Sequence, residues 1–274
     1  MTSLTGPGAT VARDTRARLP ISGTGVGAVL APLVFGVVVI GLWELAVKAF
    51  DIEPLIVPAP SAIWEQVRLN HEVIWSGMQV TGRNALIGLL IGAAVGVVGA
   101  VVSSAVRFID QMAVPLVAAL SVVPIVALAP VLYTMFGAAV DTARILVAAI
   151  SVSVPVYLNT LRGLRQVTAV HRDLMTAYAA GPVQVARAVT LPTATPYVFT
   201  GLRIGSSLAV ISALIAEYFG GPIGGLSKSI TSSAASSNYP VAYAYVGGAI
   251  ALGLAFYVAT LIVELWFSRH RRQT

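Results

Sequence analysis

Long apolar segments separated by short polar ones make up most of this chain. Of its 274 residues, 57% are hydrophobic and only 10% are charged, and the mean hydropathy is +0.86. Soluble domains carry about 25% charged residues, so this composition cannot cover a water-exposed surface. A span needs about 20 apolar residues, and six such segments with their connections fill the length. The sequence therefore predicts an all-α integral membrane protein with six transmembrane helices and no separate globular domain.

The expected organisation is a short tail followed by one transmembrane domain. Residues 1–25 are rich in Gly, Thr and Pro, and we expect a disordered N-terminal tail. The transmembrane domain covers 26–272, with an external amphipathic segment at 51–82 and a polar, basic loop at 161–196. The expected spans are 26–50, 84–106, 112–136, 142–159, 197–219 and 241–267.

Local motifs shape three of these segments. In the external segment, a Pro-Ala-Pro-Ser turn predicts a helix with Ser61 as its N-cap that ends near Leu69. The second span carries three glycines on one helix face, Gly88, Gly92 and Gly96. This spacing lets a neighbouring backbone approach closely. The third span contains three prolines, Pro115, Pro124 and Pro130. Because proline frees carbonyls that neighbours or water must satisfy, we expect a bent helix that lines a pathway, or alternatively a packing kink.

Basic residues are unevenly distributed between the connecting segments. If both termini lie inside, twelve of the 17 Lys and Arg residues fall in inner segments, as the positive-inside bias of membrane proteins requires. The loop 161–196 holds four of them, Arg162, Arg165, Arg172 and Arg187. We therefore expect cytoplasmic N- and C-termini and a cytoplasmic loop. The same bias explains the net charge of +6, so membrane lipid and not nucleic acid is the expected surrounding.

Several kinds of chemistry have no residues to support them. The chain contains no cysteine, and its histidines, His71, His171 and His270, are not spaced as metal ligands. It has no G-x-x-x-x-G-K-[ST] phosphate loop and so no route of that kind to ATP hydrolysis. Ser227 is available for an intramembrane hydrolase, but no expected span contains a histidine to activate it. We expect no catalytic residue, no metal and no cofactor in this chain.

Acidic residues gather at the ends of the expected spans. They are Glu44, Asp110, Asp141, Glu217 and Glu264. A charge at mid-membrane costs roughly 2.5–3.5 kcal/mol, and carriers coupled to protons or sodium usually contain such charges. We therefore expect energy to be delivered from outside the chain, through the loop 161–196. A self-sufficient secondary carrier or channel is the alternative, and liposomes containing only this chain would distinguish the two.

Three motifs in order along the chain resemble one family. Residues 56–64, IVPAPSAIW, are similar to an LPSPSxVW run that leads into an amphipathic helix. Residues 123–137 are similar to xxPxxALxPLxxxWFG, and AEYFG at 216–220, followed by Gly225-Leu226, is similar to AE(M/L)xG…sGLG. Over 26–272 the chain resembles the permease subunit of type I ATP-binding-cassette (ABC) importers, in the nitrate, sulfonate and taurine branch.

In that family the cytoplasmic loop holds the EAA motif, E-A-A-x3-G-x9-I-x-L-P, whose short coupling helix docks in a groove of the ATPase subunit. The resemblance implies this role for Met175, Tyr178, Ala179, Ala180, Gly181, Leu191 and Pro192. Met175 stands at the glutamate place, and Gly181 precedes Pro192 by eleven residues where the motif has thirteen. The shorter spacing implies a changed angle of the coupling helix or one half of a heteromeric pair. Loss of coupling is the alternative to docking.

The resemblance also implies a type I importer permease fold in the bacterial inner membrane and a non-catalytic transport subunit. Its partners would be ABC ATPase subunits that bind ATP and Mg²⁺, an extracytoplasmic substrate-binding protein, and a second permease copy or paralogue that encloses the pathway by alternating access. The pathway candidates are Ser121, Pro124, Tyr133, Asn159, Ser206, Ser207, Ser212 and Glu217. Their hydroxyl and amide groups could instead pack helices, and Glu217 is expected at an external gate or as a cap of the external loop. The solute is expected to be of the sulfonate, taurine or nitrate type, or a vitamin precursor such as hydroxymethylpyrimidine or riboflavin.

Overall fold

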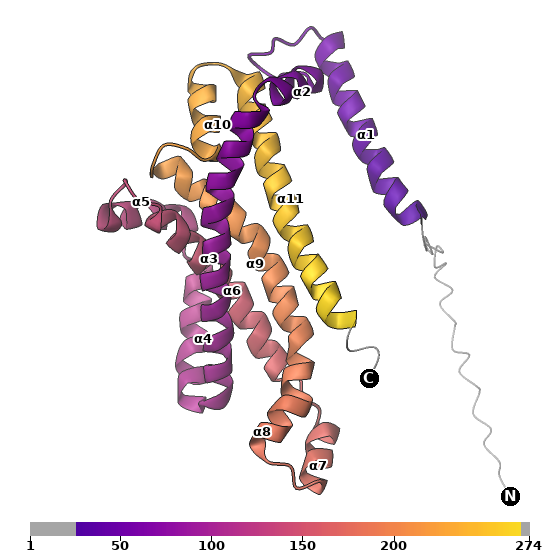
Figure 1. The fold of residues 1–274 in the computed structure, drawn as a ribbon, viewed down its shortest axis with the longest axis vertical. Helices are drawn as coiled ribbons and strands as arrows, with labels where there is room; N and C mark the ends of the chain where they lie inside the picture. Colours follow the sequence, from indigo (N-terminus) through magenta and orange to yellow (C-terminus); the bar gives the residue numbers. More distant parts are fainter. Residues whose placement is uncertain (1–25, 270–274) are drawn as a thin grey trace, which may run out of the picture.

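The computed structural model describes residues 26–269, and the regular elements in that part of the chain are all helices (Figure 1). Five of them are long and apolar enough to cross a membrane, or six if one bent pair counts as a single span. The expected all-α membrane fold is confirmed. The expected tail 1–25 and residues 270–272, the last three of the expected transmembrane domain, lie outside the described residues.

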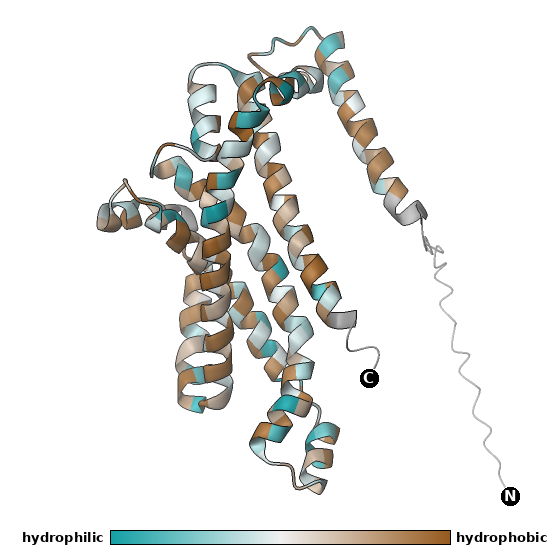
Figure 2. Cartoon of the chain, in the orientation of Figure 1, coloured by the Kyte–Doolittle hydropathy of each residue, from teal (hydrophilic) through white to brown (hydrophobic). Residues whose placement is uncertain are grey.

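The elements follow one another with short connections. The long ones are α1 (Val26–Ala49), α3 (His71–Ala105), α4 (Arg107–Val122), α5 (Ile125–Phe136), α6 (Thr142–Leu164), α9 (Leu191–Phe219) and α11 (Tyr239–Arg269). The short ones are α2 (Pro60–Leu69), α7 (Ala169–Ala177), α8 (Pro182–Val185), the π-helical turn η1 (Ala186–Thr190) and α10 (Leu226–Ala235). Hydrophobic residues dominate the middle of the long helices, and hydrophilic ones are frequent on α2 and α7 (Figure 2).

Helices α3, α6 and α9 form the centre of the bundle. The glycines of α3 lie directly against α6, where a Cβ added to Gly88 would come within 2.5 Å of the Cβ of Ala148 and 3.0 Å of the Ile145 carbonyl oxygen. A Cβ on Gly96 would lie 2.8 Å from the Ser153 carbonyl oxygen. The close approach expected from the glycine spacing is confirmed, and its role here is packing.

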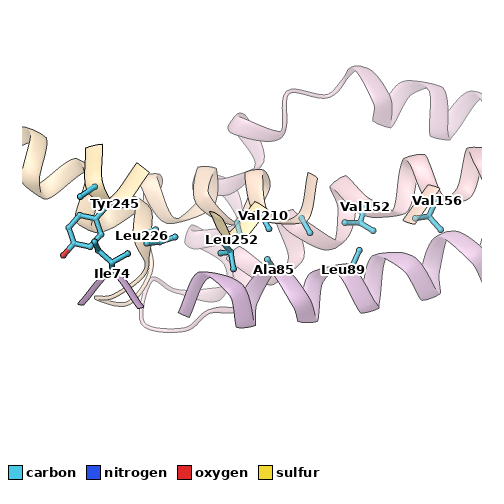
Figure 3. Close-up of a cluster of buried hydrophobic side chains, with 12 residues drawn as sticks. Ile74, Ala85, Leu89, Val152, Val156, Val210, Leu226, Tyr245 and Leu252 are labelled. Atoms are coloured by element: carbon cyan, nitrogen blue, oxygen red, sulfur yellow. The ribbon is translucent and has the colours of Figure 1, made fainter. Parts of the chain in front are cut away.

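Apolar side chains fill the space between these helices. Figure 3 shows Ala85 and Leu89 of α3 facing Val152 and Val156 of α6, with Val210 of α9 beside them. Leu252 of α11 lies beside Val210, and the same buried cluster continues to one end of the bundle with members from α3, α10 and α11: Ile74, Leu226 and Tyr245. The core therefore joins elements far apart in the sequence along most of the bundle.

The third expected span, 112–136, is divided in two. Helix α4 ends at Val122 and α5 begins at Ile125, with a bend of 102° between α4 and the body of α5. Pro124 stands at the break with φ −66°, and because its ring fixes φ and removes an N–H donor it cannot continue α4. The bend expected from the prolines is thus located at Pro124.

Helix α1 stands away from the other long helices and meets them near α2 (Figure 1). Its end is held by Glu44, whose Oε2 accepts from the N–H of Ser61 at 2.9 Å and whose Oε1 accepts from Ser61 Oγ at 2.8 Å. The carboxylate thus satisfies the positive N-terminus of α2. The prediction that Ser61 is the N-cap of α2 is wrong, because α2 already begins at Pro60. The group that bonds the Ser61 N–H comes from another helix.

Candidate functional site

Glu217 lies in the last turn of α9 and is completely buried. Its Oε2 accepts hydrogen bonds from Thr81 Oγ1 of α3 at 3.0 Å and from the N–H of Ser227 at 3.2 Å. Thr81 Oγ1 in turn accepts from the N–H of Leu226 at 3.0 Å. One carboxylate therefore ties the start of α10 to α3 and α9, which is the loop-capping role that the sequence offered for Glu217.

Arg144 lies in the first turn of α6 and is also completely buried. Its Nη1 donates to Asp141 Oδ1 at 3.0 Å. Its Nη2 donates to the carbonyl oxygens of Pro222 at 2.7 Å and Gly220 at 3.4 Å. The guanidinium group thus holds the loop between α9 and α10 from beneath, with its planar set of donors spread over three acceptors.

These groups form two hydrogen-bonded sets, one around Glu217 and one around Asp141, that hold the same loop between α9 and α10. Together we call them the ionic cluster. Asp141 also accepts from the exposed Arg83 at 2.5 Å and from the buried Asn84 at 3.2 Å. The members are Thr81, Arg83, Asn84, Asp141, Arg144 and Glu217. Arg83 and Arg144 both pair with Asp141, and Glu217 is hydrogen-bonded by Thr81 and the Ser227 N–H. Buried polar and charged groups are tolerated only when they have such partners.

Glycines shape the loop 220–225 because the ionic cluster lies directly under it. Gly221 and Gly225 have φ +101° and +97°, a left-handed conformation that side chains rarely adopt. A Cβ on Gly221 would lie 2.5 Å from Arg144 Nε, and one on Gly225 would lie 2.6 Å from Glu217 Oε2. The backbone can approach these charged groups this closely only without side chains.

Two pathway candidates, Tyr133 and Glu217, come together at this end of the bundle. The Tyr133 hydroxyl donates to the Ala216 carbonyl oxygen at 3.2 Å, and its ring lies 2.9 Å from where a Cβ on Gly220 would stand. Tyr133 therefore fixes the end of α5 to the end of α9, beside the loop 220–225.

Two further pathway candidates pack helices against each other. The Ser206 side chain is buried, with Oγ 2.8 Å from the Arg203 carbonyl oxygen and 3.2 Å from Thr260 Oγ1 of α11. Ser212 Oγ donates to Ser151 Oγ of α6 at 2.7 Å. These hydroxyls join α9 to α11 and to α6, which is the packing role that the sequence left open.

The last four candidates lie apart from the ionic cluster. Ser121 is exposed and donates to the Val117 carbonyl oxygen of its own helix at 2.8 Å. Asn159 is half-buried and donates to the Pro155 carbonyl oxygen, also at 2.8 Å. Pro124 is exposed at the break before α5, and Ser207 is half-buried on α9. These residues do not converge on one site within a single chain.

Sequence reasoning missed Arg144, Thr81 and Asn84. The sequence placed Arg144 only among the five basic residues of the outer segments, yet its side chain is completely buried. The acid three residues before it, Asp141, was the available signal, since residues i and i+3 are neighbours on a helix. Thr81 and Asn84 carried no such signal, because their partners lie far along the chain.

A second candidate site is at the opposite end, in residues 169–185, which we call the hairpin segment (Figure 1). Val170, Leu174 and Tyr178 recur every four residues, and Leu174 and Tyr178 are 50% and 75% exposed. Val183 of α8 is exposed as well. Large apolar side chains gathered on a polar segment indicate a surface that binds a partner.

The turn inside the hairpin segment does not reverse at Gly181, although this residue stands at the glycine place of the EAA motif. Helix α7 ends at Ala177, and Ala179 takes the left-handed conformation with φ 49°. Gly181 has φ −71° and gives its N–H to Gln184 Oε1 at 2.9 Å. A Cβ on Gly181 would meet only that oxygen, at 3.9 Å. The fold of this chain therefore does not itself require glycine at position 181.

Leu191 and Pro192 lie where the hairpin segment passes into α9. Pro192 has no N–H and its ring would clash with the carbonyl four residues earlier in an α-helix. The wider turn η1, in which the Leu191 N–H bonds to the Ala186 carbonyl oxygen, accommodates it. The chain is consequently helical from Pro182 to Phe219, 38 residues without a break. Between Gly181 and Pro192 the chain is thus helical from Pro182 onward, with no separate turn before Pro192.

Long apolar helices, a buried ionic cluster at one end and an exposed apolar hairpin at the other define a membrane component that works with partners. Residues 86–273 match the family model described as "Binding-protein-dependent transport system inner membrane component". The match covers more than half of the chain, which therefore belongs to this family of permeases.

Similar proteins agree with this assignment. The chain is 29% identical to a probable ABC transporter permease protein of Haemophilus influenzae, over 70% of this chain and 78% of that protein. It is 27% identical to the riboflavin transport system permease protein RibX of Chloroflexus aurantiacus, over 66% of this chain and 68% of that protein. A crystal structure of an amino acid ABC transporter with histidines has the same fold, with a TM-score of 0.57 at 17% identity, over 76% of this chain and 97% of that chain. The expected type I ABC importer permease, a multi-pass membrane protein, is confirmed.

Proposed function

We propose that this permease imports a small organic solute and that the hairpin segment couples it to a separate ATPase. The observation that carries the coupling role is the exposed row of Val170, Leu174 and Tyr178, joined by Val183. Apolar anchors spaced every four residues suit a helix that lies in a groove of a partner. Arg172 and Arg187 are exposed beside them and add long-range attraction to an acidic partner surface.

The continuous helix Pro182–Phe219 supports a way to transmit movement. At about 1.5 Å per residue it is long enough to cross the bilayer and reach beyond it. The hairpin segment adjoins one end, and Glu217 is near the other. Partner ATPase subunits that bind ATP and Mg²⁺ would draw two hairpin segments together, and the helix would carry the displacement to the ionic cluster. ATP chemistry would thus stay with the partner.

A second permease copy, or a paralogue, would complete the pathway. The pathway candidates do not converge within one chain, and Ser207, Asn159 and Ser121 remain half-buried or exposed. In a two-fold dimer one surface serves both subunits, so such residues can face each other across an axis. With the hairpin segment and both termini on the cytoplasmic side, the ionic cluster would face the extracytoplasmic binding protein.

The solute class rests on the family and on the basic residues. Arg144 is committed to Asp141 and to the loop 220–225, and so it is not free to attract an inorganic anion. RibX is named for riboflavin transport, and a sulfonate-type or vitamin-precursor solute is the corresponding proposal here. Uptake of labelled riboflavin and taurine by proteoliposomes holding permease, ATPase and binding protein would separate these two classes.

A pair of leucines at opposite ends of the bundle tests the coupling role. Leu174→Ser on α7 should lower ATPase recruitment and uptake by at least about tenfold, because an exposed anchor at an interface contributes on the order of 1.4 kcal/mol or more. Leu69→Ser on α2, where the leucine is 68% exposed, is the matched control and should change neither. Equal effects of the two substitutions, or uptake by the chain alone without ATPase, would contradict the proposal.

Gly181 gives a sharper version of this test. Because the chain has open space at its Cβ position, Gly181→Leu should leave the unfolding temperature of the permease unchanged. If the glycine is needed for close contact with the ATPase, the same substitution should reduce co-purification of the ATPase. Gln184→Leu removes the side chain that binds the Gly181 N–H and separates loss of this local bond from steric exclusion of the partner.

A further inference from the structure

The loop 220–225 carries one large side chain that no described residue covers. Ile223 is fully exposed. On one side of it, the Pro222 carbonyl oxygen is bound by Arg144 at 2.7 Å. On the other side, Gly225 lies directly on the Glu217 carboxylate. A single exposed isoleucine on a freely moving loop needs no explanation, but buried ionic groups fix the backbone on both sides of this one.

An apolar hollow lies unfilled at the same end of the bundle. Its volume is about 350 Å³, and it is lined by Leu214, Ile215, Tyr218, Phe219 and Ser227. The rings of Tyr218 and Phe219 meet edge to face with centroids 5.1 Å apart. The N–H of Ser227 is bound by Glu217. The ionic cluster therefore positions the hollow as well as the loop that carries Ile223.

One chain thus has an apolar knob and an apolar hollow, both held by the same buried groups. In a two-fold dimer each can be used twice, because residue i of one copy contacts residue j of the other and the reverse. Neither the loop 220–225 nor the lining of the hollow contains a charged residue to oppose the contact. A large soluble partner is less suited to this position, since α10 and α2 extend past the loop at this end (Figure 1).

We propose, on the basis of the proposed pairing of two permease copies, that Ile223 of each copy enters the hollow of the other. The two contacts close the pathway at the end opposite the hairpin segment. An apolar constriction of this kind excludes water and ions. Because Arg144 and Glu217 fix the knob and the hollow, the closure moves as one body with the outer ends of α6 and α9.

The absence of cysteine from this chain makes the contact testable by cross-linking. Two differently tagged copies are co-expressed with their ATPase, one carrying Ile223→Cys and the other Tyr218→Cys, and the membranes are oxidised without nucleotide. We expect a disulfide-linked pair that contains both tags, and at least about a fivefold lower yield when the ATPase is trapped with ATP. Ile56→Cys replaces another exposed isoleucine, at 69% exposure, and should give no such pair with Tyr218→Cys.

The possible outcomes separate this inference from the function on which it rests. If the tagged copies co-purify but the Ile223→Cys and Tyr218→Cys pair does not form, the inference is wrong and the dimer stands. If the tagged copies do not co-purify, the proposed dimer itself fails. Pairs joined through Ile223→Cys in both copies, or adducts with the mass of a binding protein, would overturn the knob and hollow arrangement. Maleimide labelling of each variant in detergent confirms that its cysteine is accessible.

Discussion

The ionic cluster and the hairpin segment lie near opposite ends of one continuous helix, yet their side chains are in opposite situations. Arg144 and Glu217 are completely buried and bonded to groups of the same chain. Leu174 and Tyr178 carry large side chains that are half and three-quarters exposed. The difference is consistent with the proposal that the cluster contributes to the stability of this chain and the hairpin segment to its association with an ATPase.

The physical basis of the difference is desolvation. A buried ion pair loses its hydration whether or not a partner protein is present, so removing one member leaves an uncompensated charge inside the fold. An exposed apolar side chain stays in water until a partner removes it, so substitution changes the bound state and barely affects the isolated chain. Substitutions at the two ends should therefore separate the stability of the chain from its coupling to the ATPase.

The largest expected effect is that of Arg144→Met. It roughly keeps the volume of the side chain but leaves Asp141 without its buried cation and the Pro222 carbonyl oxygen without its donor. The free energy of unfolding should fall by about 3–5 kcal/mol. Thermal or chemical unfolding in detergent measures this. Arg83→Met is the control, because Arg83 pairs with the same Asp141 but is exposed. It should cost at most about 1 kcal/mol. Similar losses from both would show that burial of Arg144 has no special energetic role.

Gly225→Ala should have the next largest effect. Its methyl group would lie 2.6 Å from Glu217 Oε2 in a backbone with φ +97°, and we expect a loss of about 2–3 kcal/mol. Gly137→Ala has a similar φ, +86°, with no atom near the added Cβ. This control measures only the cost of placing a side chain on a backbone with positive φ, about 1 kcal/mol. The difference between the two unfolding free energies measures the contact with Glu217, and a difference of zero would argue against a fixed loop.

Thr81→Val should cost about 1–3 kcal/mol, because it removes the hydroxyl that donates to Glu217 and accepts from the Leu226 N–H. The control is Thr134→Val, whose exposed hydroxyl bonds only to the Val131 carbonyl oxygen of its own helix. That substitution should change the unfolding free energy by less than about 0.5 kcal/mol. Equal changes in the free energy of unfolding for the two substitutions would mean that the hydrogen bond between Thr81 and Glu217 does not contribute to stability.

The smallest expected effect on stability is that of Leu174→Ser in the hairpin segment. Its free energy of unfolding should stay within about 0.5 kcal/mol of the parent protein, although ATPase recruitment falls. The free energy of unfolding of the purified chain and the amount of co-purified ATPase should both be measured for this variant. A stability loss as large as that of Thr81→Val would indicate that Leu174 packs within the chain, and the comparison between the two ends would then no longer hold.

Much of the architecture could be predicted because it depends on local sequence. The apolar spans follow from composition, a close helix contact from Gly88, Gly92 and Gly96, and a bent third span from its three prolines. Only the structure showed that the contact is with α6 and that the bend is at Pro124. The hairpin segment was located by its basic residues and by its likeness to the EAA motif. The turn inside the hairpin segment could not be predicted, because the presence of a glycine does not by itself determine which residue reverses the chain. Ala179, and not Gly181, adopts the left-handed conformation.

The sequence by itself determined that this protein lives in a membrane, which segments can cross it, and which family it resembles. Those properties depend on one segment of the chain at a time. The free energy of transferring a segment into the membrane, and the backbone geometry of its glycines and prolines, are set by the residues of that segment. Only the tertiary structure decided that Arg144 is buried, that Thr81 and Glu217 meet across 136 positions of sequence, and that Ile223 stands uncovered on a fixed loop. Such pairings depend on which helices are brought together, and the free energy of a buried charge is set by the partners that surround it.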